Sequence, residues 1–74
     1  MKGGMGMEPK GIRNRLNTTV YLTDKLNGLD RAAFTLTGCT IRKNALGEVF
    51  YMAELKDLKA NSVLVVRLEK VEAE

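Results

Sequence analysis

The 74-residue chain is 45% hydrophobic and 28% charged with a formal net charge of +3, and a chain of this length forms one small domain with a thin core. The single cysteine excludes an intramolecular disulfide, and the absence of histidine removes a common ligand of a tetrahedral zinc site. Oligomerisation is therefore the remaining usual means of stabilising so small a fold.

The positive charge is concentrated in the first quarter of the chain. Residues 1–20 carry four basic residues and one acidic residue, whereas eight of each kind follow. Residues 1–11 also contain four of the seven glycines and the only proline, so this stretch has few groups to bury and much backbone entropy to lose. We therefore expect a flexible basic N-terminal arm over residues 1–15 and a single small β domain over residues 16–74.

A first strand is expected over residues 16–23, where apolar and β-favouring side chains alternate. One face of this strand carries Leu16, Thr18, Val20 and Leu22. Residues 24–30 then combine an Asn-Gly turn signal with Leu26 and Leu29. This segment is either a turn with anchoring leucines or a single helical turn.

The apolar pattern changes phase at Gly38, since Leu36 lies at an even position and both Cys39 and Ile41 lie at odd ones. Successive strand residues point to opposite faces, so such a slip reverses the face unless an extra residue compensates for it. Glycine within a strand often marks a bulge or a bend. We therefore expect one long strand over residues 33–42, with a β-bulge at Gly38 that turns both halves toward the same core.

Two further strands complete the predicted sheet. Residues 44–47 are typical of a hairpin loop in which Gly47 adopts the left-handed region after a type I turn. Residues 48–56 alternate again, and the last strand is expected over residues 62–71. In the strand over residues 48–56, the side chains expected to face the core are Val49, Tyr51, Ala53 and Leu55.

Residues 52–60 leave an alternative open, because they are rich in helix formers, with Leu55 and Leu58 at helical spacing and Asn61 as a C-terminal cap. A strand followed by a loop predicts a mainly β protein, either a small curled antiparallel sheet or a barrel of four or five strands. A short helix near 52–60 predicts an α+β fold instead. A curled sheet of this kind resembles SH3-like and OB-like barrels in architecture, and this resemblance implies no function.

Several large apolar side chains are out of phase with the core pattern. An open sheet with one solvated face shows cleaner alternation, so part of the second face must be covered. These residues either belong to the core or form an interface with another copy or another protein, while Tyr21 or Phe50 could instead stack on nucleic-acid bases. The candidate interface residues are Tyr21, Phe50, Met52, Val63 and Val65. An exposed edge at the last strand would serve the same purpose.

No residue pattern in the chain indicates catalysis. Cys39 has no histidine to activate its thiol, so we expect it to be a small core residue. Carboxylates such as Glu54 alternate with apolar side chains, which is typical of a solvated strand face. Gly6 and Gly11 have the first spacing of a phosphate-binding loop, but Ile12 stands where that loop requires lysine. We predict a non-enzymatic protein with no catalytic residue, metal site, cofactor or small-molecule substrate.

Two binding functions remain. The first is a non-specific contact with nucleic-acid phosphates, made by Lys10, Arg13, Arg15, Arg42 and Lys43. The second is a homo-oligomeric or protein-interaction module that uses the second apolar face or an exposed strand edge. No hydrophobic run approaches the roughly 20 residues that a membrane span needs, and a lone cysteine without an export signal predicts the cytoplasm.

Overall fold

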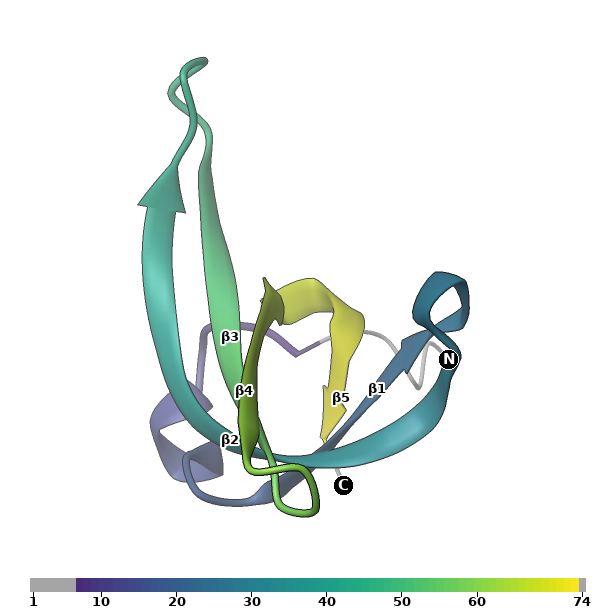
Figure 1. The fold of residues 1–74 in the computed structure, drawn as a ribbon. Coiled ribbons are helices and arrows are strands. Elements are labelled where there is room, and N and C mark those ends of the chain that lie inside the picture. Colours follow the sequence, from purple (N-terminus) through teal and green to yellow (C-terminus); the bar gives the residue numbers. More distant parts are fainter. Residues whose placement is uncertain (1–6, 74) are drawn as a thin grey trace, which may run out of the picture.

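The computed structural model describes residues 7–73, and every strand in this range belongs to one antiparallel sheet (Figure 1). The strands are β1 (Thr19–Asp24), β2 (Leu29–Lys43), β3 (Val49–Asp57), β4 (Ser62–Arg67) and β5 (Val71–Ala73). Three short 3-10 turns connect or precede them: η1 (Ile12–Arg15), η2 (Lys25–Asn27) and η3 (Leu68–Lys70). The strand order across the sheet is β4-β3-β2-β1-β5.

The prediction of a mainly β protein with a small curled sheet is confirmed. The long strand β2 pairs with β1 through its first half and with β3 through its second half, and it curves around the core (Figure 1). Strands β4 and β5 form the two edges of the sheet. Because these edges do not pair with each other in the described part of the chain, the sheet remains open and the barrel alternative is not formed. Within residues 7–73, no helix is long and apolar enough to span a bilayer.

The bend in β2 contains the predicted β-bulge. Leu36 pairs with Leu55 and Gly38 pairs with Glu54, so Thr37 is the extra residue between them. The register shift therefore adjoins Gly38, as the change of phase predicts, and Gly38 itself is the first paired residue after it. The bulge keeps the apolar residues of both halves of β2 on the concave face of the curled sheet.

The core lies on this concave face and draws on every strand except β4, together with η3. Its side chains alternate with outward-facing ones along each strand, which is the period-2 pattern of a half-buried sheet. The buried residues are Val20, Leu22, Phe34, Leu36, Ala53, Leu55, Leu68 and Val71. Cys39, Tyr51 and Val66 are partly buried and pack against this cluster.

Two turns have the conformation that their sequences predict, and Leu26 is exposed in one of them. Gly47 has a φ of +86° and its N–H donates to the Asn44 carbonyl at 3.0 Å, which closes the predicted hairpin loop. Residues 25–27 form η2, which ends at Gly28 in the left-handed region. Of the two alternatives for residues 24–30, the single helical turn is therefore formed, and Leu26, which is 97% exposed, is not an anchoring leucine.

The bounds of two predicted strands, the last and the first, are corrected. The predicted last strand over residues 62–71 is two strands, because η3 interrupts it and buries Leu68 in the core. The expectation of a strand followed by a loop over residues 52–60 is confirmed, because β3 continues to Asp57 and a turn follows, and the alternative helix is not formed. Asn61 closes this turn with a φ of 54° and an N–H that donates to the Asp57 carbonyl at 2.9 Å. The first strand begins at Thr19 rather than at residue 16.

Residues 7–15, which belong to the predicted N-terminal arm, contact the sheet. The N–H of Met7 donates to the Val71 carbonyl at 2.8 Å. Met7 and Ile12 are partly buried and pack against the core. Residues 1–6 of the predicted arm lie outside the described residues.

Candidate protein interface at the β4 edge

Four of the five predicted interface residues form one strip on the convex face of the sheet. In the register between β3 and β4, Glu54 pairs with Val65 and Lys56 pairs with Val63. Val63 and Val65 are 58% and 53% exposed. Phe50 and Met52 lie farther along the same face of β3 and are half-buried. This strip, here called the convex patch, consists of Phe50, Met52, Val63 and Val65.

Tyr21 lies apart from the convex patch. It is on β1, where it pairs with Ala33 on one side and Glu72 on the other. The guanidinium of Arg31 covers the Tyr21 ring at 4.1 Å from the ring centroid, and Arg31 Nε lies 3.7 Å from Glu72 Oε1. The structure therefore does not bring Tyr21 to the predicted interface.

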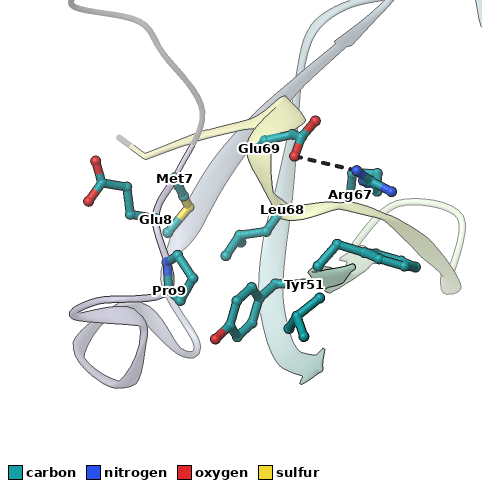
Figure 2. A pocket seen from close by; sticks show the side chains of 9 residues that line it. Met7, Glu8, Pro9, Tyr51, Arg67, Leu68 and Glu69 are labelled. Carbon is teal, nitrogen blue, oxygen red and sulfur yellow. Dashed lines mark ion pairs between the residues drawn. The ribbon is translucent and has the colours of Figure 1, made fainter. Parts of the chain in front are cut away.

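Phe50 carries an arginine of the same chain in a similar way. The Arg67 guanidinium lies 4.3 Å from the Phe50 ring centroid, and Arg67 Nη2 lies 3.8 Å from Glu69 Oε1 (Figure 2). Such cation–π contacts contribute about 0.5–1 kcal/mol at exposed sites. One face of each ring that could stack on a nucleic-acid base is thus covered by a guanidinium. This weakens the interpretation of Tyr21 and Phe50 as a stacking platform.

Strand β4 is an unprotected sheet edge. It pairs with β3 along its whole length without a register shift, and no other strand among residues 7–73 pairs with it. Edge strands are commonly protected by lysine, proline or a bulge. The sequence of β4 is SVLVVR, which has none of these and no charge before Arg67. This edge can accept a further strand.

Strand β5 is less accessible at the opposite edge. It has only three residues, and the carbonyl of Val71 already accepts a hydrogen bond from Met7. The N-terminal segment therefore occupies part of this edge. Among the described strands, β4 offers the longer free row of backbone donors and acceptors.

A pocket of about 270 Å³ adjoins the convex patch (Figure 2). It lies between the N-terminal segment, the start of β3 and the end of β4, and it shares Phe50 and Arg67 with the surface described above. Its lining residues are Met7, Glu8, Pro9, Val49, Phe50, Tyr51, Arg67, Leu68 and Glu69. The lining combines apolar side chains with the charged side chains of Glu8, Arg67 and Glu69.

The five predicted nucleic-acid contacts do not form one cluster. Arg13 and Arg15 are exposed in η1, which is followed by a contact with the middle of β2, where the N–H of Asn17 donates to the Leu36 carbonyl. Lys10 is exposed just after Pro9, which lines the pocket together with Val49 and Phe50. Arg42 lies six residues beyond Leu36 along β2, which is at most about 20 Å at 3.3 Å per residue. Arg42 pairs with Phe50 and points to the convex face. Its neighbour Lys43 pairs with Val49 and points to the concave face.

Cys39 and the acidic residues show no reactive cluster. Cys39 is half-buried opposite Ala53, and burial raises the pKa of its thiol above the ordinary value. The thiol is therefore protonated near neutral pH and weakly nucleophilic. Within residues 7–73, no group of three or more His, Cys, Asp or Glu side chains could hold a metal ion.

Sequence reasoning missed both arginines that cover aromatic rings. Alternation places Arg67 on the same face as Val65, which is the only local signal. The contact with Phe50 depends on the register between β3 and β4, and residue patterns do not determine that register.

The chain matches no protein-family model, no curated protein and no solved structure. Its function is therefore argued from its own geometry.

Proposed function

We propose that this protein is a non-catalytic binding module that accepts an extended polypeptide strand at the free edge of β4. One observation carries the proposal: the edge strand β4 has no charge before Arg67, and two of its residues, Val63 and Val65, are each more than half exposed. An added strand would form backbone hydrogen bonds with β4, which give affinity. The side chains of the added strand would meet Val63 and Val65 of the convex patch at alternate positions, which gives specificity.

The position of the exposed apolar groups supports this function. Val63, Leu64 and Val65 are consecutive, so both faces of β4 expose apolar area at the same edge. Contiguous apolar patches on small soluble proteins commonly mark interaction sites. A strand laid along β4 would cover area on both faces, because its own side chains also alternate.

A titration with a designed strand peptide tests the proposal. An acetylated and amidated peptide with alternating threonine and valine and a lysine at each end is added to labelled protein, and amide NMR shifts are recorded. We expect saturable shifts and slower amide exchange in residues 62–67. The matched control is the same peptide with N-methylated amides on one edge, which cannot complete the ladder and should not bind. Shifts that avoid β4, or equal shifts with both peptides, would contradict the proposal.

A second candidate function is a non-specific contact with nucleic-acid phosphates. It is favoured by the exposure of Lys10, Arg13 and Arg15 within one short segment, where none of the three forms an ion pair with a residue in the described range. The first turn of η1 contains no acidic residue. The proposed footprint is limited to these three side chains, because Arg42 and Lys43 lie elsewhere on the sheet.

We also propose a cytoplasmic location. Cys39 is the only thiol of the chain and is half-buried, so it has no intramolecular partner for a disulfide. Such a thiol suits a reducing compartment. Recovery of the tagged protein with exported proteins rather than with the cytoplasmic fraction would contradict this location.

A further inference from the structure

We infer that the strand that occupies the β4 edge in the isolated protein is β4 of a second copy. This inference rests on the proposed function and names its partner. The two β4 strands would run antiparallel about a two-fold axis perpendicular to the sheet. The two open sheets would then join into one continuous sheet with β4 of each copy at its centre.

The sequence of β4 favours one register for this pairing. In an antiparallel ladder, directly opposite residues share a face, so a two-fold pair must be centred on a residue that lies opposite itself. When Leu64 lies opposite Leu64 of the second copy, each Val63 lies opposite Val65 of the second copy. All four exposed valines are then covered by one another.

The neighbouring registers are less favourable. A pair centred on Val65 would place Val63 opposite Arg67 of the second copy, next to the charge of that guanidinium. A pair centred on Val63 would place Val65 opposite Asn61 of the second copy, outside the strand. Only the register centred on Leu64 matches valine with valine at both positions, and cross-strand pairs of β-branched residues stabilise sheets.

The charges that flank the two valines are complementary across the same axis. On the convex face, Lys56 of β3 lies beside Val63 and Glu54 of β3 lies beside Val65. In the register centred on Leu64, each of the two rows that contain the valines begins with Lys56 of one copy and ends with Glu54 of the other. Opposite charges therefore end both of these rows.

The other edge of the sheet is a poorer partner for β4. Strand β5 has half the length of β4, and Met7 already donates to its Val71 carbonyl. A head-to-tail pairing of β4 with β5 would also form an open or ring-shaped assembly rather than a closed pair. The self-complementary pairing of β4 with β4 produces a dimer and no larger species.

Sedimentation of three proteins over a concentration series tests the inference. From about 10 µM to about 1 mM, we expect the wild-type chain to approach twice the chain mass. Val65→Lys should weaken the dimer by at least about tenfold, because it places a charge opposite Val63 twice in each pair. The matched control is Ile41→Lys, which changes a β-branched strand residue that is 65% exposed on the concave face of β2. It should leave the dimer unchanged, and the dispersion of the NMR spectra establishes that both variants fold.

Disulfide trapping tests the register independently of stability. In a Cys39→Ser background, Leu64→Cys should form an intermolecular disulfide under mild oxidation, because the two Cα atoms would lie about 4.5–5.5 Å apart. Val65→Cys is the control. Its two copies would be diagonal neighbours about 7–8 Å apart, which exceeds the usual span of a disulfide. Trapping at position 65 and not at position 64 would overturn the register.

The outcomes separate this inference from the proposed function. A strict monomer near 1 mM, or a dimer weakened by Ile41→Lys and not by Val65→Lys, overturns the second copy as the partner. If the strand peptide still binds residues 62–67 in that case, the binding function stands and its partner is a different polypeptide. If neither the peptide nor a second copy pairs with β4, both proposals fail.

Discussion

The Thr37 hydroxyl has two acceptor oxygens of Glu54 within hydrogen-bond distance of its single hydrogen, the carboxylate Oε1 at 2.9 Å and the backbone carbonyl at 3.1 Å. Thr37 is the extra residue of the bulge, so its side chain ties the bulged segment of β2 to β3. Gly38, the next residue, lies directly opposite Glu54 in the register. A Cβ atom at position 38 would lie 3.3 Å from Glu54 Oε1. The absence of a side chain at Gly38 therefore leaves the space that the Glu54 carboxylate occupies.

Gly38→Val should destabilise the fold by more than about 1 kcal/mol, the span of β-propensity in strands. The branched side chain would displace the Glu54 carboxylate and break its hydrogen bond with Thr37. Urea unfolding followed by circular dichroism measures the change. The control is Thr40→Val, at an exposed position of β2 where valine suits a strand and should change stability little. In a Glu54→Ala background, the loss caused by Gly38→Val should shrink. Wild-type stability of Gly38→Val would show that the bulge has another cause.

Leu26 and Leu29 should respond differently to substitution, although both flank the same turn. Leu26 is 97% exposed, whereas Leu29 is half-buried and packs against the core. Leu26→Ala should change the free energy of unfolding by less than about 0.5 kcal/mol, as is usual for surface positions. Leu29→Ala should lower it by about 1–2 kcal/mol, less than the about 2–5 kcal/mol of a fully buried leucine. Urea unfolding of both variants decides this, and equal losses would contradict the packing described here.

The parts of the fold that could be predicted from sequence depend on local rules. The bulge follows from a reversal of alternation beside Gly38, and the hairpin follows from a glycine four residues after Lys43. The division of the last strand could not be predicted in this way. The alternation of apolar residues continues from Val66 to Leu68 without a break. No local signal therefore shows that the chain leaves β4 at one edge of the sheet and forms β5 beside β1 at the other edge.

Only part of the predicted interface forms in the structure, because local alternation does not determine which strands are neighbours. Alternation identifies residues that share a face of one strand, and it placed Val63 and Val65 together. Whether Tyr21 joins them depends on strand order. Because β2 separates β1 from β3, Tyr21 lies away from the convex patch. The positive φ of Arg31, 52°, belongs to the irregular pairing between β1 and β2 and has no sequence signal.

The basic segment before β1 should bind single-stranded DNA weakly and with a strong dependence on salt. Three phosphate contacts on a single strand predict a slope of log K against log salt of about −2, at about −0.7 for each contact. Fluorescence anisotropy with a labelled mixed-sequence oligonucleotide, measured at several salt concentrations, gives this slope.

The matched variants are two double charge reversals. Arg13→Glu with Arg15→Glu should abolish binding, because both side chains belong to the proposed footprint. Arg42→Glu with Lys43→Glu makes the same change in net charge at the far end of β2. It should retain most of the binding, because these residues lie on β2, outside the proposed footprint. Equal losses in both variants would mean that net charge, rather than the segment before β1, controls the contact.

Cys39 should react slowly with alkylating reagents in the folded protein. Burial raises the pKa of its thiol from the ordinary value of 9.0, so less thiolate forms at a given pH than in the unfolded chain. The rate of modification by iodoacetamide at mildly alkaline pH should therefore be lower in buffer than in urea. A faster reaction in the folded state would contradict the assignment of Cys39 as a core-packing residue.

The raised pKa of the Cys39 thiol determines how the stability of the fold changes with pH. A thiol whose folded-state pKa is raised loses its proton first in the unfolded state, so unfolding becomes more favourable as pH rises above the unfolded value. The contribution of the thiol to the free energy of unfolding is fully present below the unfolded-state pKa. It is lost as the pH rises through the folded-state pKa. Wild-type protein should therefore lose stability relative to Cys39→Ala as pH increases beyond about 9. The comparison cancels the titration of tyrosines and lysines, which both proteins share, and urea unfolding at a series of pH values measures it. A difference that stays constant across this range would mean that the thiol titrates alike in both states.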